Sequence, residues 1–460
     1  MSKLHKLTIK KIIDNKLNTR EIWNEMKSLY EQNKHLNILI ESYFDEVPTE
    51  GTIPIAIKDN YHISGKKTTC ASKMMKNFVA PVTATMVKRC GKFCSFIGKA
   101  NMDSYAMGST GKTSDFGPTL SPWKSHEGQS MSPGGSSSGS AAAVSLGICL
   151  AALGSETGGS VRTPAMMCGL VGLKPTYGVL SRYGIVELVS EYDVPGILTK
   201  TVEDCEWMFD KLHGTDDNDF TCVEYKSIKF DKNNFGIFEN IGESAETRVI
   251  LEKCAQALRN AGLQSNKSAY PSIFDYAVQT YTITNFVSVA SNLARFNGIL
   301  YGDDDKHNTR SRCFSQEIQR RTVLGNYIAY ENNIHHYYTK AQKVINEIHL
   351  AAEKLFSEYD FILLPISPDR GLTFEESLNP DPITMYELDK YADWSCVAGY
   401  PGLTIPITLH SKYKTPMAIQ IVGPYMSDSE LLRIGKIIDE CFNFNENHHW
   451  SDNSNLNGGK

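Results

Sequence analysis

The residues of this sequence best suited to bond-breaking chemistry are one lysine and two serines. Lys58 ends an apolar run, residues 53–57, whose composition predicts a buried strand. Ser136 and Ser160 lie in two separate segments rich in glycine and serine, 24 positions apart. Cleavage of an amide needs a nucleophile, a base and donors for the oxyanion, and a serine hydroxyl is too weak an acid to attack unaided. The pattern therefore suggests a serine nucleophile served by a buried base.

A lysine can replace histidine as that base only if it is held neutral. None of the 12 histidines stands in a pattern typical of a general base; His335 and His336, for example, fall in a predicted helix. Burial and hydrogen bonds to the free amine lower a lysine pKa from about 10.4, and the end of an apolar strand offers Lys58 that setting. A lysine at a strand end more often faces solvent, so the interpretation rests on the two loops. A second hydroxyl can pass the proton between base and nucleophile, and Ser136 is the candidate.

Both Gly/Ser segments are expected to be binding loops. The first, residues 130–140, has the composition of a flexible linker, yet it leads directly into residues 141–144, a run too apolar for anything but a buried helix. The second, residues 154–160, contains adjacent glycines, which let the backbone turn sharply and bring its N–H groups close to a ligand. Loops of this kind gather backbone N–H groups that face one point.

Together these segments resemble the amidase signature family. The segments that carry the resemblance are Ile57-Lys58-Asp59-Asn60, Gly134-Gly135-Ser136-Ser137-Ser138-Gly139-Ser140, residues 154–165 and Gly172-Leu173-Lys174-Pro175-Thr176. The resemblance covers nearly the whole chain, and the spacing between the two serines is the family's own. The chain departs from the pattern at Ser138, where members commonly have glycine, and at residues 192–196, a shuffled form of the family's Asp-x-x-Gly-Pro turn. Both departures concern loop geometry, because neither removes a chemical group.

The resemblance implies a role for each site residue. Lys58 corresponds to the general base, Ser136 to a bridging serine in a cis peptide, and Ser160 to the nucleophile. The backbone N–H groups that correspond to the oxyanion hole are those of Thr157, Gly158, Gly159 and Ser160. Arg162, just beyond the nucleophile, is interpreted from its position as a structural ion-pairing residue rather than a catalytic one.

The expected fold class is α/β. Strand-like runs at residues 361–364 and 403–407 alternate with helical stretches at 337–356 and 429–441. The resemblance implies the amidase-signature fold, a large mixed central β-sheet covered on both faces by helices. The domains expected are an N-terminal helical layer over residues 1–46, a single catalytic domain over 47–442, and a disordered tail, rich in Asn and His, over 443–460.

Segments farther along the chain bear on the substrate. Residues 291–298, 320–325 and 381–386 resemble the family's glutamine-hydrolysing members, which serve tRNA-dependent amidotransferases. This resemblance implies that Arg321 clamps the carboxylate of glutamine, that Asp389 binds its ammonium, and that Tyr281, in the least similar segment, adds a hydroxyl contact. A zwitterion needs charges of both signs around it. Taken alone, Arg321 is more simply interpreted as a surface charge of an amphipathic helix, and Asp389 as a helix cap.

The same resemblance implies partners. In such enzymes the released ammonia passes to a B-type subunit, which uses ATP and Mg²⁺ to activate the glutamate of Glu-tRNA(Gln), and a small third subunit completes a heterotrimer. We therefore expect no cofactor and no metal in this chain, which lacks a GxxxxGKS phosphate-binding loop. Its net charge of −5 gives no overall basic field for RNA, so tRNA is expected to be held mainly by the partner. No apolar stretch approaches the roughly 20 residues of a membrane-spanning helix.

Composition bears on the compartment. The 11 cysteines form no CxxC pair, which indicates free thiols in a reducing environment, and Cys90 and Cys94 lack companion ligands for a metal. The Asn/Lys-rich composition favours a mitochondrial matrix protein, with fungal members the nearest type; a cytoplasmic location is the alternative if the chain is bacterial. Two other functions stay open, a standalone amidase for small amides and a catalytically idle scaffold subunit. The intact Lys58, Ser136 and Ser160 argue against the second.

Overall fold

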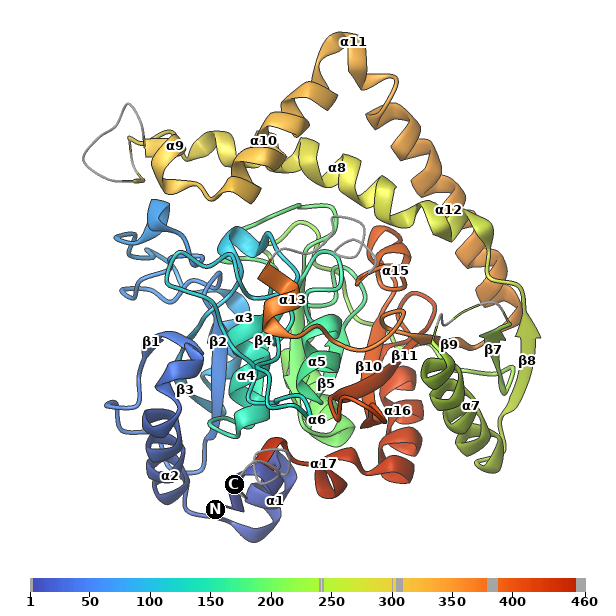
Figure 1. Cartoon of the computed structure of the whole chain (residues 1–460), viewed down its shortest axis with the longest axis horizontal. Coiled ribbons are helices and arrows are strands. Elements are labelled where there is room, and N and C mark those ends of the chain that lie inside the picture. The colour runs from blue at the N-terminus through green and yellow to red at the C-terminus, as the bar shows by residue number, and fades with distance from the viewer. Residues whose placement is uncertain are drawn as a thin grey trace.

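The structure, a computed structural model, describes residues 3–239, 241, 244–299, 301–302, 309–378 and 388–451. In these residues one mixed, 11-stranded sheet runs through the molecule in the order β1-β3-β2-β4-β6-β5-β10-β11-β9-β7-β8 (Figure 1). The strands are β1 (Leu39–Ser42), β2 (Ile53–Lys58), β3 (Cys94–Ala100), β4 (Ala151–Glu156), β5 (Val171–Lys174), β6 (Val194–Thr199), β7 (Asn234–Phe238), β8 (Gln264–Ser268), β9 (Phe361–Pro365), β10 (Gly402–Leu409) and β11 (Pro416–Val422). The α/β expectation is confirmed.

Two sets of helices pack on this sheet. One set is α4 (Ser138–Leu146) and α5 (Arg162–Cys168), which contact each other and the central strands; the other is α3 (Thr85–Cys90), α6 (Val202–Leu212), α7 (Ala245–Asn260) and α16 (Asp428–Phe442). The central strands β2, β4, β5 and β6 are buried along their whole length. Strands covered on both faces have to be apolar throughout, which is why these runs lack polar alternation.

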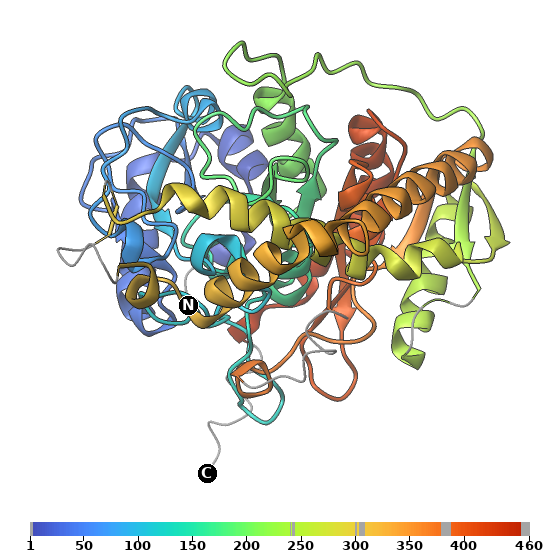
Figure 2. The same cartoon turned by 90° about the horizontal axis from the view of Figure 1, so that it is seen from above.

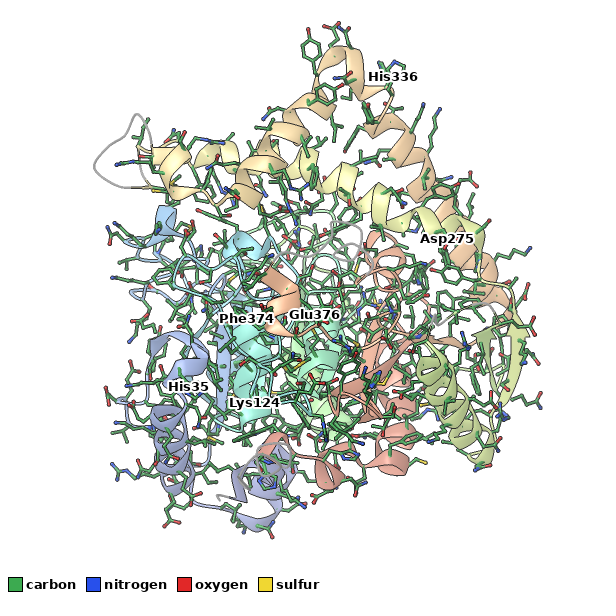
Figure 3. The ribbon with its side chains drawn as sticks, viewed as in Figure 1. His35, Lys124, Asp275, His336, Phe374 and Glu376 are labelled. Atoms are coloured by element: carbon green, nitrogen blue, oxygen red, sulfur yellow. The ribbon has the colours of Figure 1, made fainter. Side chains whose placement is uncertain are left out.

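A further layer of helices lies over one edge of the molecule. It consists of α8 (Ala277–Asn292), α9 (Thr309–Cys313), α10 (Gln316–Ala329), α11 (Glu331–Ile334) and α12 (Tyr338–Glu358), with α8 packed against both α10 and α12. Figure 1 shows this layer at the top, and Figure 2, seen from above, shows it crossing the molecule. His336 lies at its outer tip, in the turn between α11 and α12 (Figure 3), so the predicted helix is interrupted there.

The N-terminal region differs from the helical layer expected over residues 1–46. Helices α1 (Ile9–Asn15) and α2 (Thr19–Gln32) are present, but residues 39–42 form strand β1, which pairs antiparallel with β3 at the sheet edge. This region is therefore partly built into the catalytic sheet. The remaining short helices are α13 (Phe374–Leu378), α15 (Asp393–Val397) and α17 (Phe444–Asn447), with 3-10 turns at Lys3–Lys6, Lys34–Leu36, Lys73–Met75, Ser104–Ala106, Ser272–Tyr276 and Leu293–Arg295.

The C-terminal segment also differs from the sequence expectation. The composition of residues 443–451 predicts the start of a disordered tail, yet they include α17, and Phe444 is buried against Trp123. Composition misleads here because two large aromatic side chains, Phe444 and Trp450, pack against the core in a segment that is otherwise polar. Residues 452–460 lie outside the described part of the chain.

Candidate active site

Lys58 stands at the end of β2, where the sheet brings it beside a second strand end. β2 runs parallel to β4, with Ile57 paired to Leu153. Lys58 Nζ lies 2.8 Å from Ser136 Oγ and 3.0 Å from both the carbonyl oxygen and Oγ of Ser155. The structure thus brings together the predicted base and the predicted bridging serine.

Burial is the main influence on the Lys58 amine. The side chain is fully buried, and desolvation lowers its pKa to about 7, although the carboxylates of Asp103, Asp193 and Glu156 act in the opposite direction. The amine is therefore largely deprotonated just above neutral pH. A deprotonated lysine can accept a proton, which is the property that the sequence interpretation required.

The Gly135-Ser136 peptide bond is cis, as the family resemblance implied. A Cβ on Gly135 would lie 2.0 Å from Asp103 Oδ2, so this position has no room for a side chain. The Ser137 N–H donates to the carbonyl oxygen of Ser160 at 3.2 Å, and this bond joins the two Gly/Ser loops. Within the described residues the Ser136 and Ser160 hydroxyls make no hydrogen bond to each other. Catalytic contacts of this kind often tighten only when substrate is bound.

The predicted oxyanion loop follows β4 directly. In the described part of the chain the N–H groups of residues 157–160 donate to no protein acceptor, whereas those of Val161 and Arg162 donate to the Glu156 carboxylate at 2.9 and 3.0 Å. The guanidinium of Arg162 also pairs with Glu156, at 2.7 Å, and both side chains are fully buried. Arg162 is a structural ion-pairing residue, as interpreted from the sequence.

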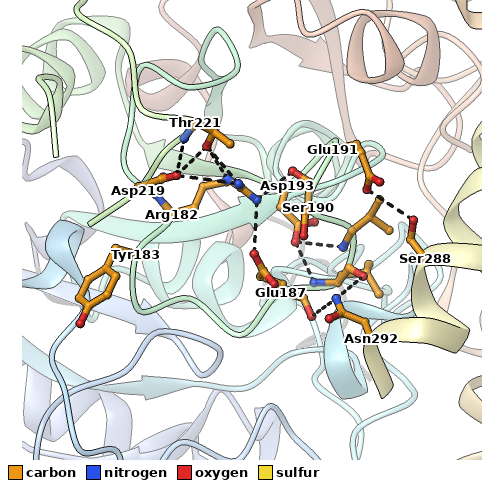
Figure 4. A network of polar contacts seen from close by, with 12 residues as sticks. Arg182, Tyr183, Glu187, Ser190, Glu191, Asp193, Asp219, Thr221, Ser288 and Asn292 are labelled. Carbon is orange, nitrogen blue, oxygen red and sulfur yellow. Dashed lines mark hydrogen bonds and ion pairs between the residues drawn. The ribbon is translucent and has the colours of Figure 1, made fainter. Parts of the chain in front are cut away.

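Asp193 holds the oxyanion loop from the other side. The Thr157 hydroxyl donates to Asp193 Oδ1 at 2.6 Å, and the N–H groups of Leu188 and Val189 donate to Oδ2. Figure 4 shows the surrounding polar network, in which Asn292 of α8 donates to the Leu188 carbonyl at 3.2 Å. The shuffled turn therefore keeps its aspartate in a positioning contact, and it ties the helical layer to the oxyanion loop.

Two of the three predicted glutamine contacts, Asp389 and Tyr281, lie beside the glycines of the loop. Asp389 is the neighbour of Gly159, where a Cβ would lie 2.1 Å from Asp389 Oδ1, and Tyr281 is the neighbour of Gly158, where a Cβ would lie 2.7 Å from the Tyr281 ring. The Thr163 hydroxyl donates to Asp389 at 2.6 Å, and the Ser109 hydroxyl donates to its other oxygen at 2.9 Å.

Arg321 is joined to Tyr281 through an amide. Its Nη1 donates to Asn285 Oδ1 at 3.1 Å, and Asn285 Nδ2 donates to the Tyr281 hydroxyl at 3.2 Å. Arg321 Nε also donates to Glu317 at 2.7 Å, one turn earlier on α10. The side chain is 14% exposed, so it is not the free surface charge of the alternative interpretation.

Sequence reasoning missed several polar residues of this site. Ser155, Asn60, Asn285 and Asp393 have no motif of their own, although Asn60 and Ser155 lie inside segments that carry the family resemblance. The Asn60 amide donates to Ser155 Oγ at 2.9 Å, and thereby fixes the hydroxyl beside Lys58. Residues 381–386, which carried part of the substrate interpretation, lie outside the described residues.

Comparison with known proteins identifies the family of this chain. The family model described as Amidase matches residues 28–432. The chain belongs to the amidase family. Among its relatives, the mitochondrial glutamyl-tRNA(Gln) amidotransferase A subunit of Aedes aegypti is 38% identical over 427 residues, covering 86% of this chain and 85% of the relative. The corresponding protein of Thermotoga maritima is also 38% identical, over 416 residues.

Solved structures place this amidase in the same fold. The crystal structure of the glutamyl-tRNA(Gln) amidotransferase A subunit from Thermotoga maritima matches with a TM-score of 0.80 and 32% identity, covering 96% of each chain. The structure of 6-aminohexanoate cyclic dimer hydrolase has the same TM-score with 19% identity, which shows a shared fold alone. The amidase-signature fold expected from the sequence is confirmed.

Neither a metal cluster nor a membrane-spanning helix is found among the described residues. Across the ranges given above, no group of three or more His, Cys, Asp or Glu side chains is placed to hold a metal ion. None of the helices described combines the length and the apolarity that crossing a membrane requires.

Proposed function

We propose that this chain is the glutamine-hydrolysing subunit of a glutamyl-tRNA(Gln) amidotransferase. The observation that carries the proposal is the contact of a fully buried Lys58 with Ser136, beside a glycine loop flanked by Tyr281 and Asp389. Lys58 and Ser136 supply a base and a hydroxyl that relays the proton. Tyr281 and Asp389 supply a phenol and a carboxylate at the place where an amino-acid amide has to bind. The relatives with 38% identity are subunits of such enzymes by name.

The proposed reaction begins with proton transfer. Neutral Lys58 accepts the proton of the Ser136 hydroxyl as Ser136 accepts that of Ser160, and Ser160 Oγ attacks the side-chain carbonyl carbon of glutamine. The negative charge that forms on the carbonyl oxygen is stabilised by the N–H groups of residues 157–160. The proton returns along the relay to the leaving nitrogen, ammonia departs, and a γ-glutamyl ester remains on Ser160. Water then attacks the ester with the relay running again, and glutamate is released.

The charged groups around the loop select the substrate. Asp389 binds the α-ammonium of glutamine, Arg321 binds the α-carboxylate, and Tyr281 contributes its hydroxyl. Asn285 and Glu317 hold the guanidinium on the side of the pocket formed by α8 and α10, and they leave Nη2 without an acceptor in the described residues. A planar guanidinium held in this way is suited to bidentate binding of a carboxylate.

The complex belongs to the same proposal. This chain carries no cofactor; a B-type partner, which holds ATP and Mg²⁺, uses the ammonia to convert Glu-tRNA(Gln), and a small third subunit completes a heterotrimer. The mitochondrial relative supports a location in the mitochondrial matrix, and the bacterial relatives make the cytoplasm the alternative. Affinity purification from the native organism, with identification of the co-purifying chains and of the compartment, tests both points.

Ammonia release from glutamine tests the activity. We expect the full chain to hydrolyse glutamine, faster with its B-type partner and charged tRNA, and Ser160→Ala to lose more than about 10³-fold in kcat because the nucleophile is gone. The matched control is Ser64→Ala, which changes an exposed serine on a loop outside the site. Hydrolysis of simple amides in preference to glutamine would contradict the proposal, as would activity that survives in Ser160→Ala.

A further inference from the structure

A second buried carboxyl group stands beside Asp389, and the reaction proposed above does not use it. Asp393 begins α15 one helical turn after Asp389, and its N–H donates to the Asp389 carbonyl oxygen at 3.1 Å. Asp389 and Asp393 are 8% and 2% exposed. Because residues four apart share one face of a helical turn, both carboxyl groups point at the same loop.

Both groups reach the two glycines of the oxyanion loop. A Cβ on Gly159 would lie 2.1 Å from Asp389 Oδ1, and one on Gly158 would lie 2.9 Å from Asp393 Oδ1. The same Gly158 position is 2.7 Å from the Tyr281 ring. Asp393 therefore lies at the edge of the pocket in which the substrate's amide has to meet the loop.

The two carboxyl groups differ in their hydrogen bonds. Each oxygen of Asp389 accepts a hydroxyl, from Thr163 and from Ser109. Asp393 Oδ1 is buried and has no hydrogen-bond partner among the described residues. A buried carboxylate oxygen without a donor is costly, so the site calls for a proton or for a cation that arrives from outside.

The groups around Asp393 do not supply that cation. The titratable groups that lie close enough to interact with it electrostatically are Asp389, Glu156, Arg162, Tyr281, Tyr270 and Cys396. The one cation in this described set, Arg162, directs its guanidinium to Glu156, Gln420 and Ser395. Burial, followed by the charge of Asp389, holds the pKa of Asp393 well above its usual range, and burial raises the pKa of Asp389 to about 6. Both shifts, together with the unpartnered Asp393 Oδ1, favour a protonated carboxyl group in the pair when no cation is bound.

We propose that Asp393 is a second, specificity-determining carboxyl group of the ammonium site, protonated in the free enzyme and deprotonated when the α-ammonium of glutamine binds between it and Asp389. The inference rests on the proposed function, and it adds Asp393 to the site that binds the substrate's ammonium group. Binding of the substrate cation displaces one proton from the Asp393 carboxyl group to solvent, and no covalent bond changes apart from that O–H bond. The pair thereby favours amides that carry a nearby cation.

Two substrates separate this role from a structural one. Glutaric acid monoamide is glutamine without its α-ammonium, and it presents the same amide to Ser160. We expect Asp393→Asn to raise KM for glutamine at least tenfold, to change kcat by less than about threefold, and to leave kcat/KM for the monoamide unchanged or higher. Asp439→Asn, which removes a partly buried carboxylate on α16 whose pKa is raised to about 6, is the matched control and is expected to leave both substrates unaffected.

A binding measurement keeps the test independent of how well Asp393→Asn folds. In the Ser160→Ala chain, calorimetric titrations in two buffers of different ionisation enthalpy count the protons released. At pH 7 we expect close to one proton more for glutamine than for the monoamide, since any change at Lys58 is common to both ligands. Equal proton release for glutamine and the monoamide would overturn this inference and leave the proposed function intact. An equal loss of kcat/KM for both substrates in Asp393→Asn would do the same. A wild-type chain that cleaves other amides and not glutamine overturns the proposed function as well.

Discussion

At the scale of single residues, the chemistry of the site depends on how far burial shifts the pKa of each titratable group. Lys58 is fully buried, and its pKa falls to about 7 because desolvation outweighs three nearby carboxylates. Since the deprotonated amine is the active form, kcat for glutamine at saturating substrate is expected to rise with pH and to level off above about 7. Initial rates of ammonia release between pH 5.5 and 9 measure this profile. A flat profile, or one that falls across this range, would show that Lys58 is not the base.

Substitution of the same residue gives a second prediction. Lys58→Arg keeps a cation of similar length, but a guanidinium stays protonated at every accessible pH and cannot accept a proton. We expect a loss of at least about 10³-fold in kcat at all pH values, comparable to loss of a general base and its relay. Lys92→Arg, at an exposed lysine, controls for the substitution itself. Recovery of Lys58→Arg activity at high pH would contradict the assignment.

The Glu156–Arg162 pair makes a prediction about stability. Arg162→Leu leaves the Glu156 carboxylate buried, with two backbone N–H donors and the Cys396 thiol in place of a cation. Breaking a buried ion pair by removing one partner costs about 3–5 kcal/mol, so the free energy of unfolding should fall by that amount. Urea denaturation followed by circular dichroism measures it. The variant Arg20→Leu, at an exposed arginine of α2, is expected to change stability by less than about 0.5 kcal/mol.

At the scale of elements, the two glycines of the loop after β4 stand where there is no space for a side chain. Gly159 has φ +75°, and a Cβ there would meet Asp389 Oδ1 at 2.1 Å; Gly51 has φ +78°, and a Cβ there would meet nothing within 4 Å. Gly51→Ala therefore isolates the cost of the left-handed backbone, about 1 kcal/mol. Gly159→Ala adds the clash and displaces the carboxylate, so we expect at least a tenfold rise in KM for glutamine in this variant alone. Equal kinetics in the two variants would contradict this account of the loop.

The elements also show which parts of the structure could be predicted from the sequence. β2, β9 and β10 are central, buried strands, so their apolar runs marked them directly. β1 was missed because it has four residues, lies at the sheet edge and is only partly buried. The lysine and serines of the site were found through local motifs. The contacts of Asp389 with Ser109 and Thr163 join positions more than 200 residues apart, and no local pattern encodes them.

At the scale of the whole molecule, the two ends of the described chain meet beneath the sheet (Figure 1). Lys6 and Lys11 both pair with Glu446, and the rings of His5 and His449 lie 3.8 Å apart. Exposed ion pairs contribute little to stability, so the anchoring rests mainly on packing, in which the partly buried Trp450 joins the ring of Phe444. This ring is 1% exposed, and it fills the space beside Gly169, where a Cβ would lie 2.7 Å away.

Phe444→Ala therefore tests whether this terminal segment belongs to the folded core. Removing a buried phenylalanine leaves a cavity, and the free energy of unfolding is expected to fall by about 3–5 kcal/mol. Phe220→Ala is the matched control, because that ring is fully exposed and its removal should change stability by less than about 0.5 kcal/mol. Urea denaturation of both variants gives the two values. Equal stabilities would mean that residues 443–451 are detached in solution, as their composition alone suggested, and a large difference would make them part of the catalytic domain.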